Sequence, residues 1–139
     1  MKRIFLVVIV LALLLTGCMP RYQPEVSREE IVAAYESAGY GVWSDTYDET
    51  LDYGEIAYVQ ANHPDGDYIY FSFFETEEDA KAYKEEFYHP FMMGLFSIIF
   101  GEPSWQRWGV YGCIVVQYDD PELLTPFEHL VERKRKGLD

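Results

Sequence analysis

The residues whose types could do chemistry are three histidines, two cysteines and 24 acidic residues. His63, His89 and His129 show neither H-x-x-x-H nor H-E-x-x-H spacing, so they indicate no zinc site. The chain also has no G-x-S-x-G nucleophile elbow and no phosphate-binding loop. The acidic residues are so numerous that any catalytic pair among them would be an arbitrary choice, and most are expected on the solvated surface. The sequence therefore predicts no catalytic residue, no metal site and no cofactor, and we expect a protein that is not an enzyme.

Cys18 has the most informative setting of these residues, because it follows a short apolar run. Lys2 and Arg3 supply two positive charges, and residues 4–15 are all apolar. Twelve such residues would cover only about 18 Å as a helix, whereas about 20 are needed to span the hydrocarbon core of a bilayer. A basic start, a short apolar run and small residues after it are typical of a secretory signal peptide.

The end of this leader, Leu15-Thr16-Gly17-Cys18, resembles the lipobox of bacterial lipoproteins: an aliphatic residue, two small residues and a cysteine. The resemblance covers residues 1–18. It implies a diacylglyceryl group on Sγ of Cys18 and a cut after Gly17, and two acyl chains on one atom provide the two signals that stable anchoring needs. The predicted location is the bacterial cell membrane, on its extracytoplasmic side. The alternative is a leader that is never cut and that keeps Cys18 as a free thiol.

Composition limits the partners of the mature chain. Without residues 1–17 the chain has 122 residues, which we divide into a tether over residues 18–24 and a single domain over residues 25–139. It holds 9 basic and 24 acidic residues, a formal charge of −15. This charge disfavours nucleic acid, which is bound by basic patches, and it disfavours unaided adsorption to anionic lipid. Cys113 lies in an apolar, strand-like run and is predicted to be buried in the core.

Acidic residues gather in residues 44–55, within a stretch from 29 to 80 that has no Lys or Arg. This segment holds Asp45, Asp48, Glu49, Asp52 and Glu55. Calcium prefers several oxygen ligands from a flexible loop, but the spacing does not match the EF-hand pattern. Calcium binding is therefore a minor hypothesis beside the prediction of no metal site.

Aromatic residues make up 17% of the chain, which raises the hypothesis of an aromatic platform. Trp43, Trp105 and Trp108 form the candidate ligand face, on which a sugar or a peptide could stack together with Tyr53 and Tyr111. The simpler alternative is that aromatic residues of strands pack in the core or in cross-strand pairs.

Capping signals and apolar spacing predict three helices. Ser27 and Glu30 form a capping box ahead of apolar residues at helical spacing. Thr76 opens a second helix in the same way, and Asp120-Pro121 opens the last one. The second helix, within residues 74–87, also resembles helices of other small bacterial lipoproteins.

Strand signals lie between these helices. Residues 55–61 and 68–74 are rich in strand formers, and turn residues separate them, so we expect a hairpin. Residues 105–118 predict a second hairpin with its turn near Gly109 to Gly112, and residues 41–47 predict a short edge strand. The order of helix, strands, helix, strands and helix predicts an α+β fold: an antiparallel sheet of four to five strands with about three helices packed mainly on one face.

The apolar run FMMGLFSIIF, residues 91–100, permits two interpretations. It either fills the covered face of the sheet, which we favour, or forms an exposed contact surface for a partner or a membrane.

The sequence as a whole predicts a lipid-anchored cell-envelope protein. We expect it to act near the membrane as a non-enzymatic binding or accessory module with an envelope protein as partner. The alternative is a solute- or glycan-binding lipoprotein with an aromatic face. An envelope enzyme is least favoured, because no nucleophile, metal or cofactor motif is present.

Overall fold

The computed structural model describes residues 23–49, 51, 53–88 and 107–138. The leader with Cys18, the apolar run 91–100 and Trp105 lie outside these residues. In chain order the elements are α2 (Arg28–Ser37), β1 (Gly41–Thr46), β2 (Glu55–Asn62), β3 (Tyr68–Phe74), α3 (Glu77–Phe87), β4 (Arg107–Tyr111), β5 (Ile114–Tyr118), the 3-10 helix η1 (Pro121–Leu124) and α5 (Thr125–Arg135).

The five strands form one antiparallel sheet in the order β1-β2-β3-β5-β4. The predicted hairpin of β2 and β3 is confirmed, and β1 pairs with β2 as the predicted edge strand. In the second hairpin, β5 pairs with both β3 and β4, so β4 becomes the other edge of the sheet. The α+β fold with a sheet of four to five strands is therefore confirmed.

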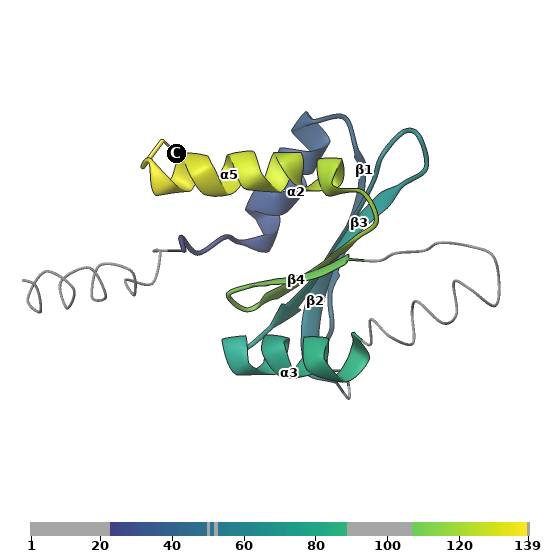
Figure 1. Cartoon of the computed structure of the whole chain (residues 1–139), viewed down its shortest axis with the longest axis vertical. Coiled ribbons are helices and arrows are strands. Elements are labelled where there is room, and N and C mark those ends of the chain that lie inside the picture. The colour runs from purple at the N-terminus through teal and green to yellow at the C-terminus, as the bar shows by residue number, and fades with distance from the viewer. Residues whose placement is uncertain (1–22, 50, 52, 89–106, 139) are drawn as a thin grey trace, which may run out of the picture.

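The helices cover both faces of the sheet (Figure 1). Helices α2 and α5 contact each other and lie on one face, whereas α3 packs on the opposite face against β3, β4 and β5. Two of the three α-helices in the described residues thus share one face, in line with the prediction. The position of α3 follows from the apolar residues on the second face: Phe74 and Val115 are both buried there, against Ala80 of the helix.

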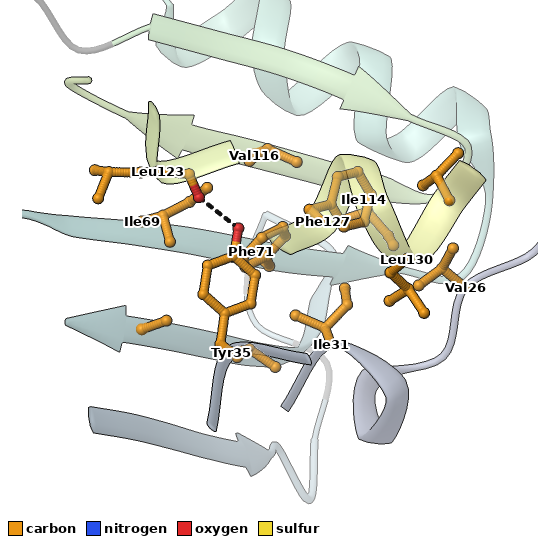
Figure 2. Packing of buried hydrophobic residues seen from close by; sticks show 13 residues of the cluster. Val26, Ile31, Tyr35, Ile69, Phe71, Ile114, Val116, Leu123, Phe127 and Leu130 are labelled. Carbon is orange, nitrogen blue, oxygen red and sulfur yellow. Dashed lines mark hydrogen bonds between the residues drawn. The ribbon is translucent and has the colours of Figure 1, made fainter. Parts of the chain in front are cut away.

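The main core lies between the sheet and the helices α2 and α5 (Figure 2). Ile31 and Tyr35 of α2 are fully buried against Phe71 of β3. The Tyr35 ring meets the Phe71 ring edge to face at 5.4 Å, and its hydroxyl donates to the backbone oxygen of Leu123 at 2.7 Å. Tyr35 therefore joins three separate elements: α2, the sheet and η1.

The predicted starts of α2 and α3 are confirmed. The Ser27 hydroxyl accepts from the Glu30 backbone N–H at 3.2 Å, and the Glu30 carboxylate accepts from the Ser27 backbone N–H at 2.7 Å, which completes the capping box. The Thr76 hydroxyl caps α3 in the same way by accepting from the Asp79 backbone N–H. Glu30 also forms an ion pair with Lys134 of α5 at 2.7 Å, so the residue that completes the cap of α2 also links α2 to α5.

The last helix differs from its prediction. Asp120 does accept from the Glu122 backbone N–H, but the turn that it caps is the 3-10 helix η1, and the α-helix begins only at Thr125. Pro126 is the physical reason, because it has no N–H to donate to the carbonyl four residues earlier. An α-helix that began at Pro121 would therefore break at Pro126.

The prediction that Cys113 is buried is wrong, because this residue is exposed. Tyr111 pairs with Ile114, so Gly112 and Cys113 form the two-residue turn of the second hairpin, whereas Gly109 lies within β4. Gly112 has a φ of 55°, a left-handed conformation that suits glycine at the first turn position. The turn therefore begins at Gly112 and places the thiol of the next residue outside the core.

Candidate ligand-binding face

Polar and aromatic side chains form a row across the sheet on the face opposite α2 and α5. Trp43, Gln60, Tyr70, Gln117 and Trp108 are successive register partners on β1, β2, β3, β5 and β4. Register partners in an antiparallel sheet point to the same face. All five residues of this row therefore belong to the face that α3 covers only in part.

Helix α3 covers the β4 end of the row. Trp108 stacks on Tyr83 of α3, with ring centres 5.9 Å apart, and its ring also meets Tyr88 at 6.0 Å. The indole N–H of Trp108 is buried without a hydrogen-bonding partner. Trp108 is thus part of the packing between α3 and the sheet and does not offer a free ring.

The structure does not bring Trp43 and Trp108 together. Trp43 and Trp108 share a face but lie on the two opposite edge strands, about 19 Å apart at the usual strand spacing. Trp105 lies outside the described residues. Of the two predicted tryptophans that the structure describes, Trp43 is the one with an exposed ring.

Trp43 presents its ring at the β1 edge, with 56% of the residue exposed. A side chain at Gly41 would lie 3.4 Å from Cη2 of Trp43, which places the indole over this glycine. Because Gly41 has no side chain, the ring can lie along its own strand. The six-membered ring of the indole thus lies close to Gly41 at Cη2 and Cζ3.

Tyrosines extend this surface beside the row. We define the open face as the side chains of Trp43, Tyr58, Gln60, Tyr70 and Gln117. The rings of Tyr58 and Tyr70 stack in parallel, with centres 5.6 Å apart and an angle of 6° between the planes. Tyr47 meets Tyr58 at 5.9 Å. The sequence reasoning treated these tyrosines only as strand formers. Their signal is the alternation of Tyr58 and Gln60 with buried Ala57, Val59 and Ala61.

Glu55 lies at one end of this tyrosine group and is only 8% exposed. The Tyr70 hydroxyl donates to Oε1 of Glu55 at 3.3 Å. Burial raises the pKa of the Glu55 carboxyl above its ordinary value, and it raises the pKa of the Tyr70 hydroxyl as well. The buried Ser72 hydroxyl has no hydrogen-bonding partner at ordinary distance and angle. It nevertheless lies near the Glu55 carboxyl and lowers the pKa of that group, against the larger effect of burial.

This environment predicts how stability depends on pH. Because the folded state raises the pKa of Glu55, it binds the proton more tightly than the unfolded chain does. The contribution of Glu55 to the free energy of unfolding is fully present below the ordinary pKa of 4.5. It is lost as the pH rises through the higher pKa of the folded state. Glu55→Gln keeps an acceptor for Tyr70 without the charge. We expect this variant to exceed the wild type in stability at pH 8 by about 1 kcal/mol, the scale of a partly compensated buried polar group.

Urea unfolding of both proteins between pH 4 and pH 8 measures this difference. Glu49→Gln is the control, since Glu49 is exposed on the loop before β2 and should show no such change. A wild-type protein that gains stability over Glu55→Gln as the pH rises would contradict the prediction.

Two surface hollows lie away from the open face. One, of about 530 Å³, lies between α5 and the second hairpin, with walls that include Gly109, Tyr111 and Phe127. The other, of about 940 Å³, lies between α2 and α5, and His63 and His129 are among its lining residues.

The acidic segment 44–55 does not gather into a metal site as far as the structure describes it. Within the described residues, no group of three or more His, Cys, Asp or Glu is placed to hold a metal ion. Asp52 lies outside them. Asp45 and Glu55 both belong to the open-face side of the sheet, where Asp45 pairs with Tyr58.

Comparison with known proteins finds no matching family model, no matching curated protein and no matching solved structure. Across the part of the chain that the structure describes, no helix is both long and apolar enough to cross a bilayer.

Proposed function

We propose that the chain is a lipid-anchored binding module of the bacterial cell envelope. Cys18 carries the lipid on the extracytoplasmic side of the membrane, and the module acts without catalysis by holding a ligand or partner on its open face. The observation that carries the binding role is the row from Trp43 to Gln117, which lies on the face opposite α2 and α5 and which α3 covers at its Trp108 end.

The start of the domain supports a short distance to the membrane. Pro24 is buried, and its backbone oxygen accepts from the Tyr111 hydroxyl at 2.7 Å. The six residues from Cys18 to this point reach at most about 20 Å when fully extended. A lipid on Cys18 would thus hold the hairpin of β4 and β5 close to the bilayer, although the negative charge of the domain is repelled by anionic lipid.

Charge and exposure favour binding over catalysis. Large clusters of exposed aromatic side chains are rare on the surfaces of monomeric proteins. Where they occur, they mark sites of contact with a ligand or a partner. The Tyr70 hydroxyl and the Glu55 carboxylate are engaged with each other by a hydrogen bond of 3.3 Å. The open face therefore has the character of a recognition surface.

Site-specific photo-crosslinking in intact cells tests this proposal. A photoreactive residue at Trp43 probes the open face, and one at Ser37, exposed on α2 on the other side of the sheet, is the matched control. We expect a distinct adduct of higher mass from position 43 that is absent from position 37. Equal labelling from both positions, or none from position 43, would count against the open face as the site of binding.

A further inference from the structure

We propose that the open face binds an uncharged carbohydrate chain, because a flat row of ring and carboxamide side chains crosses the sheet from Trp43 to Gln117 without a basic residue. This inference rests on the proposed function and names the class of ligand for the same site.

The shape of the row fits an elongated ligand. Trp43, Gln60, Tyr70 and Gln117 occupy four adjacent strands in register, a length of about 14 Å at the usual strand spacing. Trp108 and α3 close the far end, while β1 is an edge strand and leaves the near end open. A chain of several sugar rings can lie along such a row, whereas a single small solute would contact only one part of it.

The side chains match the chemistry of a sugar. Each sugar ring has apolar C–H faces, which stack on aromatic rings, and hydroxyl groups, which both donate and accept hydrogen bonds. A carboxamide likewise offers both donors and an acceptor, so Gln60 can pair with hydroxyls in either sense. Gln117 lies beside the Tyr83 hydroxyl of α3 and offers its remaining hydrogen-bonding capacity at the covered end of the row. The indole of Trp43 and the ring of Tyr70 provide the stacking surfaces.

Contacts within the protein hold these groups in place before a ligand arrives. The Gln60 carboxamide donates to Oδ1 of Asn62 at 2.9 Å, which orients it. Tyr70 is held by its stack on Tyr58 and by its hydrogen bond to Glu55. Side chains that are already ordered lose less entropy on binding, so this arrangement favours affinity.

Charge excludes the main competing ligands. On the described strands, the residues that share this face include no Lys or Arg, and its ionisable carboxyls are Asp45 and Glu55. Anionic polysaccharides, nucleic acids and anionic lipids all need cationic partners. An uncharged glycan avoids this repulsion.

Binding of defined oligosaccharides to the full chain, purified in detergent, tests the inference. The probes are cellotetraose and the tetramer of N-acetylglucosamine, with tetragalacturonate as the anionic comparison of equal length. We expect at least one uncharged tetramer to bind about tenfold more tightly than its monomer, since the longer chain reaches more of the row. Tetragalacturonate should not bind. Calorimetry and quenching of tryptophan fluorescence provide independent readouts.

Variants locate the ligand on the face. Trp43→Ala should weaken binding of the tetramer about tenfold, the size expected for one lost stacking contact. Gly41→Leu should weaken binding comparably: a Cβ there already reaches van der Waals contact with the indole at 3.4 Å, and we expect the bulk beyond Cβ to shift the ring without removing it. Tyr53→Ala is the control: Tyr53 is also 56% exposed, but its ring packs on Phe87 of α3. Thermal unfolding curves confirm that each variant is folded.

The outcomes separate this inference from the proposed function. Failure of both uncharged tetramers to bind, together with a crosslink from position 43 to a protein, would overturn the carbohydrate inference and keep the open face as a protein-binding surface. Loss of the crosslink as well would overturn both. Tetramer binding that Trp43→Ala and Gly41→Leu leave unchanged would also refute the inference, because the sugar would then lie elsewhere.

Discussion

Replacing Cys18 with alanine is expected to abolish stable attachment of the protein to the membrane. In the proposed lipobox the thiol of Cys18 carries the diacylglyceryl group, and in lipoproteins with this motif the leader is cut after the lipid is attached. The variant should therefore retain residues 1–17 and lack any lipid mass. Its twelve-residue apolar run covers only about 18 Å as a helix, which is too short for a firm anchor.

Membrane fractionation followed by intact mass measurement checks both parts of this prediction. Cys113→Ala is the matched control, because it removes the other cysteine of the mature chain, which is exposed on the turn between β4 and β5. The control should stay in the membrane fraction with the lipid attached and the leader removed. A wild-type protein whose mass still includes residues 1–17 would show that the leader is not cut and would refute the lipobox assignment.

Tyr35→Ala is expected to destabilise the domain by about 4 kcal/mol, the cost of truncating a buried aromatic residue. Tyr35 is fully buried and contacts Tyr40, Phe71 and the backbone of Leu123. Its loss leaves a cavity where α2, the sheet and η1 meet. Since a domain of this size has a total stability of about 5–15 kcal/mol, the variant should be close to unfolding at physiological temperature.

Tyr35→Phe separates the packing of the ring from the hydrogen bond. The phenylalanine keeps the edge-to-face contacts but leaves the Leu123 carbonyl without its donor, which should cost about 1–2 kcal/mol. Urea denaturation of the wild type and both variants measures these differences. Equal destabilisation by the two substitutions would mean that the hydrogen bond, and not the packing of the ring, dominates at this position.

Local signals in the sequence predicted most elements of the fold. The Ser27–Glu30 capping box and the Thr76 cap act over three residues, so they can be read without knowledge of the rest of the chain. The same holds for the turn residues between β2 and β3. Pro126 shows the limit of this reasoning. The cap at Asp120 predicts a helix that starts at Pro121, but the proline at position 126 sets the start of the α-helix at Thr125.

The open face could not be predicted in the same way. Trp43, Gln60 and Tyr70 share a row through the pairing of β1, β2 and β3, and Gln117, far from them in the sequence, joins it only because β5 pairs with β3. Long-range pairing of this kind depends on which surfaces are buried together and not on any short pattern. The sequence reasoning therefore chose tryptophans by type, and it grouped Trp43 with Trp108, which the fold places at the opposite edge and under α3.

By itself, the sequence determined the lipobox prediction, the acidic character of the chain, and the order and nature of its helices and strands, since each of these depends on composition or on neighbouring residues. Only the tertiary structure decided that α3 crosses to the second face, that Cys113 is exposed, and that Glu55 is buried beside Tyr70. The physical reason is that burial and side-chain pairing are properties of the packed sheet. A residue's face and neighbours are fixed by strand register, and register is set by the whole chain.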